Sequence, residues 1–128
     1  DLAWVVRAAN SKADARAAAS RLLDLSEERR PTAIVAVSDL MALGVMHALY
    51  ETGLQPGADV AVVGYDDIPT AQYFQPPLSS VRQPIAEVGE RVVEMLLQVI
   101  AGESLEERRV LLKPELIVRA SSGEPVAS

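Results

Sequence analysis

The sequence predicts an α/β fold, in which a parallel sheet is flanked by helices. Two apolar runs, residues 33–37 and 60–63, are rich in β-branched side chains and contain no polar residue, which is typical of strands buried on both faces. Residues 12–25 and 39–52 carry apolar side chains at helical spacing and alternate with those runs. Because strands and helices alternate, we expect right-handed βαβ crossovers.

The first expected strand covers residues 2–8, which are almost entirely apolar. Asn10 and Ser11 interrupt the apolar pattern, and either side chain can cap a following helix. The helix predicted over residues 12–25 is rich in Ala and Leu at helical spacing. A charged, solvated connection over residues 27–30 then leads to the second strand.

That second strand, residues 33–37, ends in two polar residues, Ser38 and Asp39. Both residue types are good N-caps, and an apolar run follows them, so a helix is predicted over residues 39–52. Gly53 stands where a glycine commonly ends a helix.

The third strand, residues 60–63, ends in Gly64, a tyrosine and two carboxylates, Asp66 and Asp67. Gly64 allows the backbone to turn, or another group to approach closely. Ligands of open parallel sheets bind beyond the carboxyl ends of the strands, so polar residues there predict a binding site. Three such strand ends are expected along one edge: Asn10 with Ser11, Ser38 with Asp39, and Asp66 with Asp67.

After residue 67 the predicted elements no longer alternate between strand and helix. Residues 68–78 hold three prolines and two aromatic side chains, which indicates a long, stiffened loop. Residues 79–84 predict a short strand that Pro84 ends, and residues 85–101 predict an amphipathic helix that ends at Gly102. Beyond it we expect a charged loop at 103–108, two short extended pieces at 110–113 and 115–119, and a frayed tail at 121–128.

Composition narrows the class of protein. The 128 residues suit one domain or most of one, and 49% are hydrophobic. A net charge of −6 without a basic stripe disfavours binding to nucleic acid or a membrane surface. The absence of cysteine excludes disulfides and thiolate metal sites, and we expect no metal and no cofactor. The chain starts without a signal-like segment, so we expect a cytoplasmic piece of a longer protein, while a mature secreted protein stays open.

Four stretches stand in the order found in one known family: residues 31–44, 62–69, 76–84 and 114–121. Together they resemble the C-terminal part of the effector-binding core of the LacI/GalR family of bacterial transcription regulators. The first two also occur in related periplasmic sugar-binding proteins, whereas the Pro-Pro-Leu-Ser-Ser-Val-Arg-Gln-Pro stretch at 76–84 favours the regulators.

The resemblance implies a periplasmic-binding-protein-like lobe with an incomplete second lobe. Residues 1–84 would belong to the C-terminal lobe, residues 85–113 to the N-terminal lobe, and residues 114–128 would form a return strand and tail. The helix at 85–101 would then expose apolar surface, for which association or a swapped arrangement is our hypothesis. Family members bind operator DNA through a helix-turn-helix headpiece that this chain does not contain.

The resemblance also assigns roles to single residues. Asp66 matches the aspartate that contacts the effector, with a loop cap as the alternative, and its oxygens can accept hydrogen bonds from sugar hydroxyls or nucleobase N–H groups. Asp67 is either a further contact or the supporting cap. Ser38 stands where the family often has Asn, and Gln83 matches a polar residue at the lobe crossing. Asp39 is most simply a helix N-cap, with effector contact as the second interpretation.

Leu43, Tyr73 and Phe74 resemble the family's subunit contact surface, so we expect a homodimer, although all three could be ordinary core residues. The function we predict is the effector-binding and dimerisation fragment of a LacI-type regulator, usually a repressor, sensing a sugar or nucleobase-like molecule. The alternative is a periplasmic sugar-binding protein of an ABC importer. An enzyme is not expected, because no lysine, phosphate loop or further ligand accompanies the Asp pair.

Overall fold

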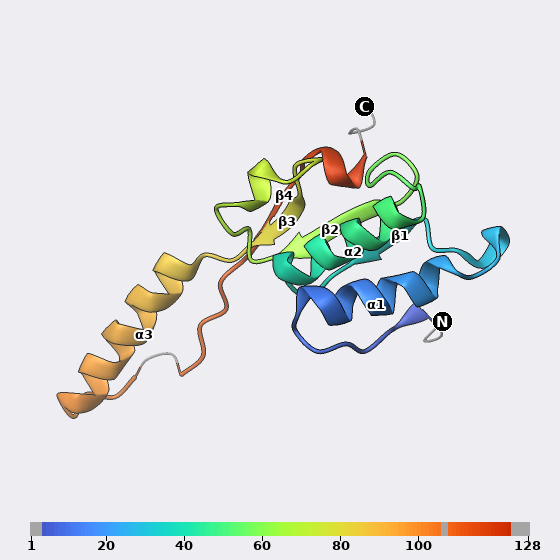
Figure 1. Ribbon diagram of the computed structural model, residues 1–128. Coiled ribbons are helices and arrows are strands. Elements are labelled where there is room, and N and C mark those ends of the chain that lie inside the picture. The colour runs from blue at the N-terminus through green and yellow to red at the C-terminus, as the bar shows by residue number, and fades with distance from the viewer. Residues whose placement is uncertain (1–3, 106–107, 124–128) are drawn as a thin grey trace. The chain divides into compact units, whose positions relative to one another are not determined.

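The computed structural model describes residues 4–105 and 108–123 (Figure 1). The chain divides into two compact units, of which the first contains Asp1–Arg82 and Leu116–Ser128 and the second Gln83–Glu115. The sequence-based assignment of residues 85–113 to a separate lobe stays a prediction.

A four-stranded sheet forms the centre of the first unit, with the strands in the order β1-β2-β3-β4. The strand β2 pairs in parallel with β1 on one side, where Ile34 lies opposite Val62, and with β3 on the other, where Gly64 lies opposite Ser80. The predicted parallel sheet is therefore confirmed. The strands are β1 (Ala33–Val35), β2 (Ala61–Tyr65), β3 (Ser79–Arg82) and β4 (Glu115–Ile117).

Two of the predicted helices are present, α1 (Lys12–Leu23) and α2 (Asp39–Glu51), and they pack against each other (Figure 1). The side chain of Ser11 accepts a hydrogen bond from the Asp14 amide and so caps α1. Gly44 of α2 lies against the α1 backbone, where an added Cβ would overlap the carbonyl oxygen of Lys12. The core between α2 and the sheet contains Met46, Leu49, Val62 and Leu78, all fully buried.

The predicted strand over residues 2–8 is wrong for the part described, because residues 4–8 form no strand. Residues 1–3 lie outside the described part of the chain. A strand needs a partner for its backbone groups, and in the described chain β1 pairs only with β2. The edge position of β1 also contradicts its predicted burial on both faces, since Val35 is 75% exposed and Val37 is 76% exposed.

The described residues after β4 form more regular structure than the predicted frayed tail. Residues Ala120–Ser122 form a short 3-10 helix, and the side chain of Ser121 is fully buried. The prediction of a frayed tail is therefore wrong for residues 121–123, while residues 124–128 lie outside the described part. The expected extended piece at 110–113 also forms no strand, whereas β4 lies within the second expected piece.

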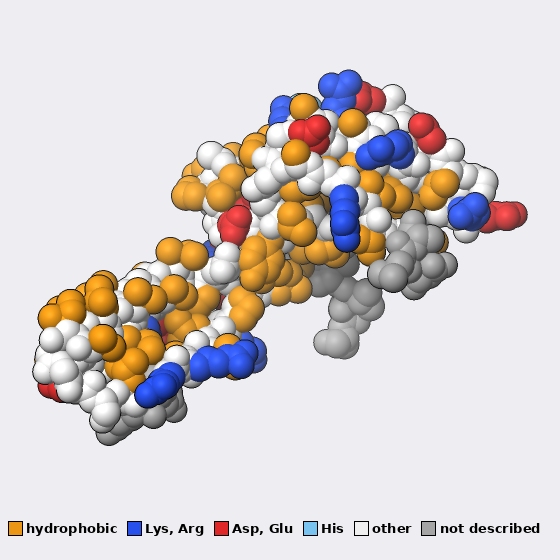
Figure 2. Space-filling model, turned by 90° about the horizontal axis from the view of Figure 1, so that it is seen from below, with side chains coloured by type: hydrophobic (Ala, Val, Ile, Leu, Met, Phe, Trp, Pro, Cys, Tyr) orange, Lys and Arg blue, Asp and Glu red, His pale blue; other side chains and the backbone are white. Residues whose placement is uncertain are grey.

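The second unit consists of the helix α3 (Ile85–Ile100) and the segment that follows it. This helix is strongly amphipathic, as its sequence predicts, and none of its residues is buried in the described structure. Figure 2 shows hydrophobic side chains gathered on this unit. The exposed apolar side chains include Ile85, Val88, Val92, Leu96, Val99 and Ile100. Within the described residues, no helix is long and apolar enough to cross a membrane.

Candidate functional site

The carboxyl ends of the parallel strands carry the polar residues that the sequence singles out. Ser38 follows β1, and its hydroxyl caps α2 by accepting a hydrogen bond from the Met41 amide at 3.3 Å. The same hydroxyl donates to Oδ1 of Asn10 at 2.9 Å. Asn10 therefore reaches this edge of the sheet, although no strand precedes it. Two of the three predicted polar strand ends thus come together.

Asp39 lies beside Ser38, but it is not the N-cap. It is the first residue of α2, and its side chain is fully buried. Its Oδ2 accepts a hydrogen bond from the Ile68 amide at 2.8 Å, and its Oδ1 accepts one from the Ser80 hydroxyl at 2.6 Å. Asp39 thereby joins the start of α2 to the residues after β2 and to β3. Both of its oxygens are engaged within the protein, so an effector contact for Asp39 stays a prediction.

Gly64 explains how Asp39 comes so close to β2. The glycine does not adopt a positive φ angle, so the turn considered from the sequence is not its role. A Cβ at this position would overlap Oδ1 of Asp39 and would lie 3.0 Å from Cδ2 of Leu78. The second sequence-based interpretation, a close approach by another group, is therefore confirmed.

Asp66 is exposed at the end of β2, in the position where a ligand of a parallel sheet is expected. Its φ angle is 104°, in a region that non-glycine residues seldom adopt. The backbone N–H of Asp66 donates to the carbonyl oxygen of Val81 at 2.9 Å. Such strained residues cluster at binding sites, where the surrounding structure maintains them.

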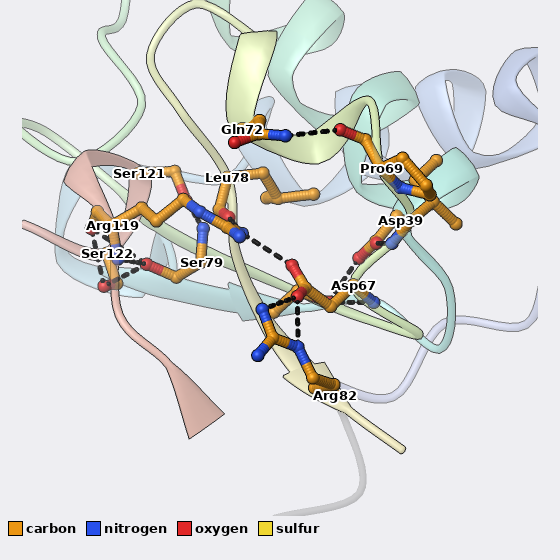
Figure 3. Close-up of polar contacts among 12 residues, drawn as sticks. Asp39, Asp67, Pro69, Gln72, Leu78, Ser79, Arg82, Arg119, Ser121 and Ser122 are labelled. Atoms are coloured by element: carbon orange, nitrogen blue, oxygen red, sulfur yellow. Dashed lines mark hydrogen bonds and ion pairs between the residues drawn. The ribbon is translucent and has the colours of Figure 1, made fainter. Parts of the chain in front are cut away.

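Asp67 has a different environment from its neighbour. Its carboxylate side chain is only 4% exposed, and two arginines bind it (Figure 3). Arg82 contacts Oδ2 through Nε at 2.7 Å and through Nη2 at 2.6 Å. Nη1 of Arg119 lies 2.7 Å from Oδ1. The Asp67 amide also donates to the Ser80 hydroxyl at 3.0 Å. These contacts favour the supporting role for Asp67, and an effector contact for Asp67 stays a prediction.

The Asp67 carboxyl has a lowered pKa. Burial acts to raise this pKa, but the charges and hydrogen bonds of Arg119 and Arg82 lower it by more. The acidic residue next to Asp67 in the chain is Asp66. The Ser80 hydroxyl, which is also nearby, accepts a hydrogen bond from the Asp67 backbone amide. The charged form of Asp67 is therefore the form that the folded protein stabilises.

Asp67→Asn should destabilise the protein by about 2 kcal/mol near neutral pH, because charge-assisted hydrogen bonds are lost. Since the folded pKa is depressed, this contribution is present above the ordinary value of 3.8 and disappears as the pH falls through the folded pKa. Urea unfolding of both proteins across this range checks the prediction. A difference in unfolding free energy that stays constant into the most acidic samples would contradict it.

A network of serines fixes the returning C-terminal segment to the sheet (Figure 3). The Ser121 hydroxyl donates to the Val62 carbonyl oxygen at 2.6 Å and accepts from the Ser79 amide at 2.8 Å. The Ser79 hydroxyl donates to the carbonyl oxygen of Arg119 at 2.8 Å and accepts from its amide at 2.6 Å. Sequence reasoning missed these residues. The adjacent serines within the strand over 79–84 were the one signal available, because a buried strand seldom carries two hydroxyls without partners for them.

The other predicted site residues are less clearly placed. Gln83 belongs to the second compact unit, so the structure does not place it against Asp66. Tyr73 is 75% exposed, as an interface residue should be, and Leu43 is partly buried. Phe74 packs against the hydrophobic core. The predicted subunit interface thus stays a prediction, with Tyr73 its most accessible member.

An apolar hollow of about 170 Å³ lies elsewhere in the first unit, along β1. Trp4, Val6, Ile34, Met41 and Val45 are among its lining residues, and none of the lining side chains is charged. The polar edge is therefore the better candidate for recognition of a polar ligand. Among the described residues, no group of acidic or histidine side chains is arranged to hold a metal ion.

Comparison with known proteins agrees with this geometry. The family described as periplasmic binding protein-like domain matches residues 1–122. The HTH-type transcriptional repressor PurR of Aliivibrio fischeri strain MJ11 is 36% identical over 118 residues, which are 92% of this chain and 35% of the repressor. The chain therefore spans about a third of the length of this curated relative.

Two solved structures are similar to the chain. A regulatory protein of the LacI family from Chloroflexus aggregans has a TM-score of 0.90 and 48% identity, covering 96% of this chain and 44% of that one. The lac repressor dimer bound to operator and the anti-inducer ONPF has a TM-score of 0.79 and 34% identity, covering 89% of this chain and 34% of that one. These relatives are transcription regulators, which confirms the prediction that the chain is not an enzyme.

Proposed function

Because the chain belongs to the LacI family of transcription regulators, and specifically to its periplasmic-binding-protein-like effector-binding part, we propose that it senses a small polar molecule and contributes to a homodimeric repressor. The proposed effector is a sugar, with a nucleobase-like molecule as the second class. Operator DNA would be bound by a headpiece that is not among these 128 residues.

The observation that carries this proposal is the position of Asp66. Asp66 is an exposed residue at the carboxyl edge of a parallel sheet, on backbone that the Val81 hydrogen bond helps to fix. A carboxylate accepts hydrogen bonds only, and its two oxygens can accept from two hydroxyls of one sugar ring. Ser38, which follows β1, and Asn10, which is hydrogen-bonded to it, supply further polar groups at the same edge of the sheet.

Regulation would follow from linkage between effector binding and the arrangement of the dimer. An effector that binds one arrangement better shifts the population toward it, and the shift cannot exceed the difference in binding free energy. Couplings of this kind amount to about 1–3 kcal/mol. Exposed Tyr73, on the loop after β2, is the residue we propose for contact with a second subunit.

The test is isothermal titration calorimetry of the 128-residue chain with lactose, D-ribose, adenine and hypoxanthine. We expect at least one probe to bind, and Asp66→Asn to weaken that binding at least about tenfold, because a charge-assisted hydrogen bond becomes a neutral one. The matched control is Asp24→Asn, which changes an exposed carboxylate at the C-terminal end of α1.

Equal affinities for wild type and Asp66→Asn would remove Asp66 from the site. Failure of every probe to bind at about 10 mM, a concentration at which even a dissociation constant near 1 mM is detected, would contradict both proposed effector classes for this chain.

A further inference from the structure

We propose that Asp67 is a positioning residue, which together with Arg82 and Arg119 forms a hinge anchor for the two connections that lead into and out of residues 83–115. This inference rests on the proposed function. It names the part of the first unit about which residues 83–115 would reorient when an effector binds. All three residues of the hinge anchor belong to the first compact unit.

The two arginines stand at the two points where the chain crosses between the units. Arg82 is the last residue of β3, directly before the second unit begins at Gln83. Arg119 lies shortly after Leu116, where the chain re-enters the first unit. Both guanidinium groups bind the same carboxylate, Arg82 at 2.6 Å and Arg119 at 2.7 Å. The outgoing and returning connections are therefore fixed to one side chain at the end of β2.

Further bonds make this attachment rigid. The Asp67 amide donates to the Ser80 hydroxyl, which itself donates to buried Asp39. Nη1 of Arg119 also donates to the Leu78 carbonyl oxygen at 2.6 Å, and the Arg119 backbone is bound through both its groups to the Ser79 hydroxyl. Arg119 is thus held to the sheet by bonds that do not involve the carboxylate, as Figure 3 shows.

The burial of the carboxylate distinguishes the hinge anchor from a surface ion pair. Asp67 is 4% exposed and Arg119 is 18% exposed, whereas the Arg16–Glu51 pair between the two helices is about half exposed on both sides. Exposed pairs contribute little and rearrange readily, while a buried carboxylate that loses a partner leaves an uncompensated charge. Breaking the buried arrangement should therefore cost more free energy than breaking the exposed one.

The position of the hinge anchor in the sequence gives it a functional consequence. Asp67 follows Asp66, the proposed effector contact, and both adopt positive φ angles, 104° for Asp66 and 49° for Asp67. The residue proposed to contact the effector is therefore joined by one peptide bond to the residue that holds both connections.

The experiment measures orientational freedom without any effector. Because the sequence contains no cysteine, Ala17→Cys in α1 and Glu90→Cys in α3 give two exposed sites for spin labels. Pulsed electron paramagnetic resonance then reports the distribution of distances between the labels. We expect Asp67→Asn, Arg82→Met and Arg119→Met each to broaden this distribution about twofold, with unchanged circular dichroism. Arg16→Met, which removes the exposed ion pair, is the matched control and should leave the width unchanged.

Two results would overturn the proposal: a wild-type distribution already as broad as that of the variants, or hinge-anchor variants as narrow as the control. If Asp67→Asn does not fold, Arg82→Met still tests the idea, because the Arg82 side chain is 51% exposed and its loss creates no buried cavity. Asp67→Glu should restore part of the wild-type width, as it keeps the charge. If no probe binds in the calorimetric titration but the variants still broaden the distance distribution, the proposed function is rejected and the hinge-anchor proposal is retained.

Discussion

Gly64→Ala should destabilise the protein by about 3 kcal/mol, a loss of roughly 12 °C in melting temperature, because the added methyl group has no space. The new Cβ would overlap Oδ1 of Asp39 and press on the Leu78 side chain. Neither neighbour can move freely, since Asp39 is held by two hydrogen bonds and Leu78 is fully buried in the core.

The matched control is Gly89→Ala in α3, where nothing lies within 4 Å of the added Cβ. Alanine is the better helix former by about 1 kcal/mol, so this variant should be at least as stable as wild type. Thermal and urea unfolding of the two variants check the prediction. A Gly64→Ala protein as stable as Gly89→Ala would show that Asp39 does not approach β2 as described.

Asp39→Ala should cost about 3 kcal/mol or more in unfolding free energy. The substitution removes the acceptor for the Ile68 amide and for the buried Ser80 hydroxyl, and each orphaned group costs about 1–3 kcal/mol. It also removes a carboxyl group from the first turn of α2, where the helix dipole favours negative charge. Unfolding in urea measures the loss.

The control for Asp39→Ala is Asp24→Ala, which truncates an exposed aspartate after the last residue of α1. A change within about 0.5 kcal/mol is expected there. Equal stability of both variants would mean that the Asp39 bonds contribute nothing to the fold. Since Asp39 supports the residues just after β2, its loss should also mobilise the backbone around Asp66.

The elements predicted correctly are those whose determinants are local in the sequence. The helices α1 and α2 follow from apolar spacing and from Ser11 and Ser38, which act as caps by binding amides three residues ahead. The strand β2 follows from an apolar run that is rich in β-branched residues. Residues 4–8 have equally strand-like side chains, yet no strand forms, because pairing is a property of neighbours that the local pattern does not contain.

The residues of the candidate site also differ in whether the local sequence could predict their positions. The exposed position of Asp66 follows from the rule that polar residues after parallel strands lie at one edge. The two arginines on Asp67 could not be predicted, because their contacts join segments far apart in the chain and side-chain ion pairs leave no periodic signal. Ser121 was assigned to a tail for the same reason, since its partners are backbone groups of β2 and β3.

The effector would be recognised at the ends of the strands, and amide chemical-shift mapping by NMR tests this most directly. The probe that binds in calorimetry is titrated into the isotope-labelled chain. The account predicts that the largest shift changes occur in three segments: residues 10–11, 38–39 and 66–68. Changes confined to the apolar hollow along β1, with those three segments unperturbed, would contradict it.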